Sequence, residues 1–160
     1  MTGLNIKTKH SNDRALSSLS VIIVYVSISG NTREVAQMLA EELERHVERV
    51  KLYNILGNEP FPDVQAYDAM LIGSYTWDNG QTPFDVKDFV ADLGYKPENV
   101  FVFGTGDTQF GGDDTFCLAA EKLATFYHSP LPPLKVEQSP RGEQEQEVVN
   151  WMKGVLTWLS

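Results

Sequence analysis

Hydroxyl and amide side chains follow directly after an apolar run in the N-terminal part of the chain. The run, residues 21–26, has the composition of a buried strand, and an amphipathic segment begins after it with Ser27, Ser29, Asn31 and Thr32. Backbone N–H groups at a helix N-terminus attract anions, and these side chains add hydrogen-bond donors. Gly30 lets the backbone approach a ligand closely. The pattern predicts a phosphate-binding loop at residues 27–32.

This loop has neither of the common nucleotide-binding patterns. It lacks the G-x-x-x-x-G-K-[ST] pattern of nucleotide triphosphatases and the G-x-G-x-x-G pattern of dinucleotide-binding folds. A ligand with a single terminal phosphate is therefore favoured over a triphosphate or a pyrophosphate. The alternative is that Ser29 caps the helix and the other hydroxyls close a turn, with no ligand involved.

The rest of the chain alternates between strand-like and helix-like segments joined by short turns. This order is typical of an α/β protein whose parallel sheet is covered by helices on both faces. We expect strands at residues 20–26, 47–53, 67–74, 99–104 and 134–137. We expect helices after the phosphate-binding loop and at residues 83–93, 115–127 and 143–159. In the helix at 115–127 the residues expected to face the core are Phe116, Ala119, Ala120, Leu123 and Phe126.

The length and charge of the chain exclude several classes of function. With 160 residues, 42% of them hydrophobic, the chain is long enough to bury one full core. Nucleic acids and anionic membranes require basic surfaces, so the net charge of −9 argues against both as partners. The acidic surface instead suits protein partners with basic docking surfaces.

Other features of the sequence indicate a cytoplasmic protein of one domain. No run approaches the roughly 18 apolar residues that a membrane span needs, and residues 1–18 lack the apolar segment of a secretion signal. The single cysteine, Cys117, fits a reducing compartment and is expected to be a buried apolar residue. The three histidines have no metal-ligand spacing, so no metal site is expected. Residues 1–19 are expected to form a flexible extension and residues 20–160 the folded domain.

Three loops are selected as the ligand site. In open parallel sheets, ligands bind beyond the carboxyl ends of the strands, where the strand order reverses. The loops are residues 27–32, 74–82 and 105–114, and the second and third each contain one aromatic residue, Trp77 and Phe110. Two such rings beside a phosphate-binding loop would form a slot for a flat ring, so we expect a phosphorylated planar heterocycle. The alternative is that both rings pack under their own loops.

The motifs of these loops together resemble the flavodoxin family. They are S-x-S-G-N-T at residues 27–32, Gly73-Ser74-Tyr75-Thr76-Trp77 and Gly104-Thr105-Gly106-Asp107. The resemblance spans residues 20–159, and the absence of an extra loop around residues 134–137 is similar to the short-chain subgroup. It implies a flavodoxin-like three-layer sandwich with a five-stranded parallel sheet of order 2-1-3-4-5 and helices on both faces. It also implies noncovalently bound FMN.

The resemblance assigns the phosphate and the ribityl chain to two of the loops. The residues that match the phosphate loop of the family are Ser27, Ser29, Gly30, Asn31 and Thr32. Tyr75 and Thr76 occupy positions that help to close over the phosphate and the ribityl chain.

The resemblance assigns the isoalloxazine ring to the second and third loops. Trp77 matches the aromatic residue that covers one face of the ring, and Phe110 stands where the family usually has Tyr or Trp over the other face. The turn whose peptide rotates against the ring on reduction is matched by Asp78, Asn79 and Gly80. Gly106 and Asp107 match the loop that meets the pyrimidine edge, and Thr105 precedes them in the same motif.

The function that the resemblance implies is low-potential electron transfer, with no catalytic residues. The protein is expected to be a monomer that shuttles single electrons between a reductase and an acceptor enzyme, the chemistry being that of FMN. One alternative is a flavodoxin-like activator of ribonucleotide reductase (NrdI-like), and a less favoured one is a flavodoxin-like quinone reductase. Two aromatic residues covering the ring argue against a quinone reductase, which needs a roomier flavin face. A receiver-like binding module would need an acidic pair after the first strand, which is missing.

Overall fold

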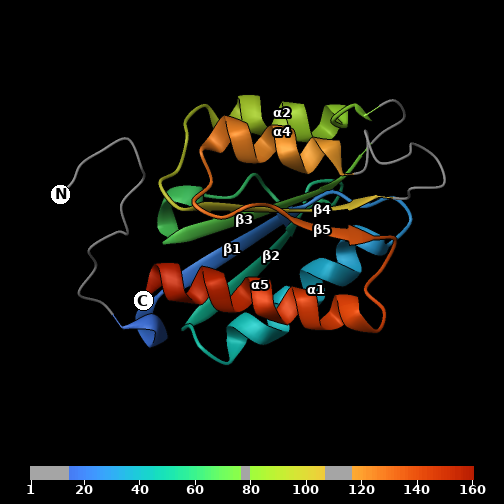
Figure 1. Ribbon diagram of the computed structural model, residues 1–160. Helices are drawn as coiled ribbons and strands as arrows, with labels where there is room; N and C mark the ends of the chain where they lie inside the picture. The colour runs from blue at the N-terminus through green and yellow to red at the C-terminus, as the bar shows by residue number, and fades with distance from the viewer. Residues whose placement is uncertain (1–14, 77–79, 107–116) are drawn as a thin grey trace.

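A computed structural model describes residues 15–76, 80–106 and 117–160 of the chain. Five parallel strands form one sheet in the order β2-β1-β3-β4-β5, as expected from the sequence (Figure 1). The strands are β1 (Ser20–Tyr25), β2 (Arg49–Asn54), β3 (Ala69–Tyr75), β4 (Val100–Gly106) and β5 (Leu134–Glu137). The α-helices are α1 (Asn31–Glu44), α2 (Phe84–Leu93), α4 (Leu118–Tyr127) and α5 (Glu143–Leu159). Two short 3-10 helices are η1 (Leu16–Ser18) and η2 (Val64–Ala66).

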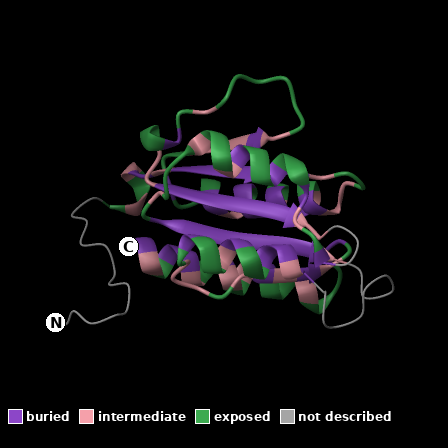
Figure 2. Ribbon diagram, turned by 90° about the horizontal axis from the view of Figure 1, so that it is seen from above, coloured by how far each residue is buried: buried purple, intermediate pink, exposed green. Residues whose placement is uncertain are grey.

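The helices cover both faces of the sheet and make a three-layer sandwich. Helices α1 and α5 lie on one face, and α2 and α4 lie side by side on the other (Figure 1). The central strands are therefore buried throughout, while the outer sides of the helices are exposed (Figure 2). Burial on both faces explains why these strands are continuous apolar runs rather than alternating patterns. In β1, for example, residues 21–25 are all buried.

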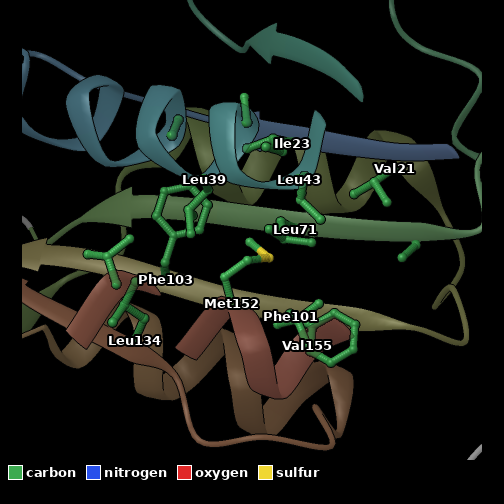
Figure 3. Packing of buried hydrophobic residues seen from close by; sticks show 14 of the residues in the cluster. Val21, Ile23, Leu39, Leu43, Leu71, Phe101, Phe103, Leu134, Met152 and Val155 are labelled. Atoms are coloured by element: carbon green, nitrogen blue, oxygen red, sulfur yellow. The ribbon is translucent and has the colours of Figure 1, made fainter. Parts of the chain in front are cut away.

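A separate hydrophobic cluster forms on each face of the sheet. Under α1 and α5, Leu39 and Met152 point toward Leu71 on β3, and Phe103 and Leu134 extend the same cluster (Figure 3). Under α2 and α4 the cluster contains residues of four strands and both helices. Trp151 and Trp158 of α5 are partly buried against the first cluster.

Gly73 of β3 and Phe103 of β4 are partners in the sheet register. The ring of Phe103 lies over Gly73, so that a Cβ atom added to Gly73 would lie 2.1 Å from Cε2 of the ring. No real Cβ atom tolerates this distance. The glycine therefore provides the space that the Phe103 ring occupies in the core.

The structure corrects one detail of the predicted core. Phe126 was expected to face inward on α4, but it is 43% exposed, whereas its neighbour Tyr127 is 2% exposed. The helix begins at Leu118, after a left-handed residue, and its buried positions are Ala119, Ala120, Leu123 and Tyr127. The prediction is confirmed for Ala119, Ala120 and Leu123, and the error is confined to the last turn, where the inward residue lies four positions after Leu123 rather than three. Phe116 lies outside the described residues.

Among the other elements, β5 and α5 have the predicted boundaries, and the rest differ from them by at most two residues, as in β2, which was expected at 47–53 and spans Arg49–Asn54. Residues 1–14 lie outside the described residues, and Leu19, just before β1, is 1% exposed in the core. Among the described helices, none combines the length and the apolar character needed to cross a membrane.

Candidate functional site

The strand order reverses beside β1, which pairs with both β2 and β3. The chain leaves β1 for a helix on one face of the sheet and leaves β3 for a helix on the other, so the loops after these strands diverge (Figure 1). The carboxyl ends of β1, β3 and β4 lie at the same edge, and all three predicted loops begin there. The sheet therefore brings the beginnings of the three loops together at its switch point.

The N-terminus of α1 provides backbone donors at this edge. Its N-cap is Gly30, which has a left-handed backbone (φ 98°) and makes no side-chain cap hydrogen bond. The alternative in which Ser29 caps the helix is therefore wrong. The first amides of a helix have no partner within it, so the N–H groups of Asn31, Thr32 and Arg33 can meet an anion. A Cβ at Gly30 would find no atom within 4 Å, so the space beside it is open.

A small polar hollow of about 130 Å³ lies on this loop. Its lining residues are Tyr25, Ser27, Ile28, Ser29, Gly30, Arg33 and Asn54. The amide of Gly30 donates to Oγ of Ser27 at 3.1 Å, which holds the loop in a closed turn. This bond agrees with part of the alternative interpretation, in which hydroxyls close the turn, but the hollow beside it remains polar and open.

The sequence interpretation missed Asn54 at this hollow. Asn54 ends β2, a strand whose following loop was not selected, and its Oδ1 accepts from the amide of Leu56 at 3.0 Å. The rule that selected the other loops, that ligands bind beyond the carboxyl ends of the strands, would have identified it if it had also been applied to β2. Arg33 has an exposed side chain at the rim of the hollow.

A buried hydrogen bond joins the first loop to the third. The hydroxyl oxygens of Thr32 and Thr105 are 2.8 Å apart, although the residues are separated by 73 positions in the sequence. Thr32 is 1% exposed and Thr105 is 2% exposed, so neither hydroxyl can exchange this partner for bulk water. The bond fixes the first turn of α1 against the end of β4.

Replacing Thr105 with Val is expected to lower the free energy of unfolding by about 1–2 kcal/mol, because it leaves the buried hydroxyl of Thr32 unpaired. Urea unfolding followed by circular dichroism measures the effect. The double variant Thr32→Val/Thr105→Val should lose less than the sum of the two single variants, because it leaves neither hydroxyl behind. If the changes in the free energy of unfolding simply added, the two hydroxyls would not interact.

The second loop is connected to α4 by two hydrogen bonds. The N-cap of α4 is Cys117, which makes no side-chain cap bond, and the amide of Ala119 instead donates to Oγ1 of Thr76 at 3.1 Å. The carbonyl of Gly80 accepts from Nζ of Lys122 at 3.2 Å. These bonds hold the two described ends of the loop against one helix. Trp77, Asp78 and Asn79 lie between them, outside the described residues.

Tyr75 of the second loop is half-buried, and burial raises the pKa of its hydroxyl, with a smaller effect from Asp85. Its phenol therefore stays neutral near neutral pH. In the third loop, Thr105 is buried and Gly106 is half-buried, and the amide of Gln138 donates to the carbonyl of Gly106 at 2.7 Å. Asp107 and Phe110 lie outside the described residues, so the aromatic slot stays a prediction.

Cys117, the N-cap of α4, has a fully buried side chain. Desolvation raises the pKa of its thiol to about 12, and Sγ lies 4.0 Å from the carbonyl oxygen of Val136. An unreactive buried thiol agrees with its interpretation as a small apolar residue. Within the described ranges, no group of three or more His, Cys, Asp or Glu residues could hold a metal ion.

Comparison with known proteins identifies relatives over most of the chain. The family model described as Flavodoxin matches residues 23–130. The chain is 31% identical over 142 residues to Probable flavodoxin 2 of Bacillus subtilis, covering 82% of this chain and 90% of that protein. It is 30% identical to the Flavodoxin of Maridesulfovibrio salexigens, covering 84% and 94% of the two chains. Oxidised Flavodoxin 2 from Bacillus cereus has a similar structure, with a TM-score of 0.72 at 31% identity over 86% of this chain and 98% of that one.

Proposed function

Because the chain belongs to the flavodoxin family, whose members bind FMN and are electron carriers rather than enzymes, we propose that it shuttles single electrons at low potential between redox partner proteins. The observation that supports the proposal most directly is the N-terminus of α1. Its unpaired amides and the neighbouring hydroxyls lie at the switch point of the sheet. Bound FMN supplies the redox chemistry, and the protein supplies binding, orientation and electrostatics.

The described residues of the first loop fit the phosphate of FMN. Gly30 leaves open space beside the backbone, and the hollow is polar. We propose that the phosphate is held by the side chains or amides of Ser27, Ser29, Gly30, Asn31 and Thr32. The positive end of the helix dipole and the exposed Arg33 at the rim both favour an anion there.

We propose that the second and third loops hold the rest of the cofactor. Tyr75 and Thr76 would lie beside the ribityl chain, and Thr105, Gly106 and Asp107 beside the pyrimidine edge. Trp77 and Phe110 would cover the two faces of the ring, and the turn Asp78-Asn79-Gly80 would offer its backbone to the edge between them. Because Lys122 binds the carbonyl of Gly80, the end of this turn is anchored to α4.

The partners in this proposal are a reductase that donates electrons and an enzyme that accepts them, both with basic docking surfaces. A net charge of −9 favours such partners and increases their rate of association at low ionic strength. We further propose that the protein is a cytoplasmic monomer, with residues 20–160 as the FMN-binding domain and residues 1–19 as an extension.

Stepwise reduction tests the function. The visible spectrum of the purified protein should show flavin bands, and a dithionite titration should proceed in two separate one-electron steps, with a long-wavelength band at half reduction. The second electron adds negative charge near the acidic residues predicted on the loops, Asp78, Asp107, Asp113 and Asp114, and like charges oppose that step. Direct two-electron bleaching with no such band would contradict the carrier function and favour the quinone-reductase alternative.

A further inference from the structure

A shallow apolar groove of about 350 Å³ lies between α2 and α4, outside the site described above. These two helices lie side by side on one face of the sheet (Figure 1). The apolar part of the lining comes from Val86, Val90, Ala91, Leu123 and Phe126. Phe126, the residue that was expected to face inward, is 43% exposed at this groove. The outward position of Phe126 thus gives the groove an aromatic wall.

Lysines surround this apolar surface. Lys87 and Lys122 line the groove, and Nζ of Lys96 lies 4.2 Å from the centre of the Phe126 ring. Over the described ranges none of the three has a carboxylate partner, whereas Lys51 pairs with Glu59 and Lys135 with Glu121. In a chain with a net charge of −9, this groove is a local basic surface.

The acidic residues of the same helices are turned away from the groove. Asp85, Asp88 and Asp92 are exposed on α2, but none of them lines the groove. At 3.6 residues per turn they occupy the flank of α2 opposite to Val86 and Val90. On α4, Glu121 is turned toward Lys135 of β5. The charge around the groove is therefore positive, because the lysines there are not neutralised by neighbouring carboxylates.

We propose that this groove is a docking site for an acidic, amphipathic segment of a partner protein. An apolar side chain of the segment enters between α2 and α4 beside Phe126, and its carboxylates meet Lys87, Lys96 and Lys122. Burial of the aromatic wall supplies affinity, and the lysines supply charge complementarity. The partner's charge is opposite to that of the redox partners proposed above, so the two kinds of partner would be distinguished by their charge.

Docking at the groove would also affect the cofactor loop. Lys122 donates to the carbonyl of Gly80, at one end of the second loop. A carboxylate seated in the groove would compete for the same ammonium group. Occupation of the groove is therefore expected to perturb residues 80–82 in addition to the lining of the groove.

Nuclear magnetic resonance of the full chain loaded with FMN tests this proposal. The probe is a short synthetic peptide in which Glu and Asp alternate with Leu and Phe, and the control probe has Lys in place of the acidic residues. The acidic peptide should shift the signals of Val86, Val90 and Leu123, with a dissociation constant well below about 1 mM at low salt. The control peptide should not shift them.

Charge-reversal variants complete the test. The double variant Lys87→Glu/Lys96→Glu should weaken binding of the acidic peptide by about tenfold or more, because it replaces attraction by repulsion. Arg45→Glu/Lys153→Glu is the matched control: it also reverses two charges, on exposed side chains at the end of α1 and on α5, across the sheet, and it should leave binding unchanged. The flavin spectrum should be the same in all variants, which shows that the cofactor site is intact. The proposal is overturned if the acidic peptide gives no shifts at the groove, if the basic peptide binds equally well, or if Arg45→Glu/Lys153→Glu has the same effect as Lys87→Glu/Lys96→Glu.

Discussion

FMN is expected to bind to the apoprotein more tightly than riboflavin by several kcal/mol, since the two ligands differ only in the phosphate that the loop at residues 27–32 is proposed to hold. Each charge-assisted hydrogen bond contributes roughly 1.5–3 kcal/mol, and the N-terminus of α1 offers three amides in addition to the hydroxyls. Titration of each flavin with apoprotein, followed by the quenching of flavin fluorescence, gives the two dissociation constants.

Replacement of Ser29 with Ala separates the phosphate from the rest of the ligand, because the exposed Ser29 lines the hollow, whereas the Thr32 hydroxyl is bound to Thr105. The variant should bind FMN more weakly and bind riboflavin almost as the parent does. Thr125→Val serves as a control, because Thr125 is exposed on α4. Equal affinities of the parent protein for FMN and riboflavin would show that the loop does not hold a phosphate.

Gly73→Ala is expected to destabilise the protein by about 3 kcal/mol, at the upper end of the usual cost of overpacking a core. The added methyl group would lie 2.1 Å from Cε2 of Phe103, and the ring is fully buried in its cluster. Urea unfolding measures the change. Gly154→Ala in α5 is the matched control: its Cβ would meet only Cδ1 of Leu131, at 3.3 Å, and alanine favours a helix interior.

A second substitution tests whether the clash with Phe103 causes the destabilisation by Gly73→Ala. If the clash with Phe103 causes the loss of stability, Phe103→Leu should lower the free energy of unfolding less in the Gly73→Ala variant than in the parent protein. The smaller side chain at position 103 makes room for the added methyl group. A Gly73→Ala variant as stable as the parent would mean that the two strands separate easily, in conflict with the packing described here.

The general form of the fold could be predicted from the sequence because its central strands are buried on both faces. Each of them is therefore a continuous apolar run ended by turn residues, and the position of such a run depends little on its neighbours. The strand order was expected from the resemblance of three loop motifs to a known family, since alternation alone allows several winding orders. The loops after β1, β3 and β4 were located for the same reason, as each follows an apolar run.

The connections within the site could not be predicted, because they join residues that are distant in the sequence. Nothing near Thr32 indicates that its hydroxyl meets Thr105, and nothing near Thr76 indicates that it caps α4. The orientation of Phe126 could not be predicted either, because positions three and four residues after Leu123 both lie near the inward side of a helix, and both hold aromatic residues, Phe126 and Tyr127. Asn54 differs from these residues, because it could have been predicted. The rule that ligands bind beyond the carboxyl ends of the strands was applied to β1, β3 and β4 but not to β2, which Asn54 ends.

Because Cys117 is buried, the reactivity of its thiol reports local unfolding around the start of α4. Its side chain is fully buried at the start of α4, and the high pKa leaves only a trace of thiolate near neutral pH. A thiol reagent can therefore react only with molecules in which the start of α4 has opened and exposed Cys117. When reclosing is faster than modification, the labelling rate is proportional to the population of that open form. This one native cysteine thus allows the opening free energy of the α4 region to be measured without any engineered label, separately from global unfolding.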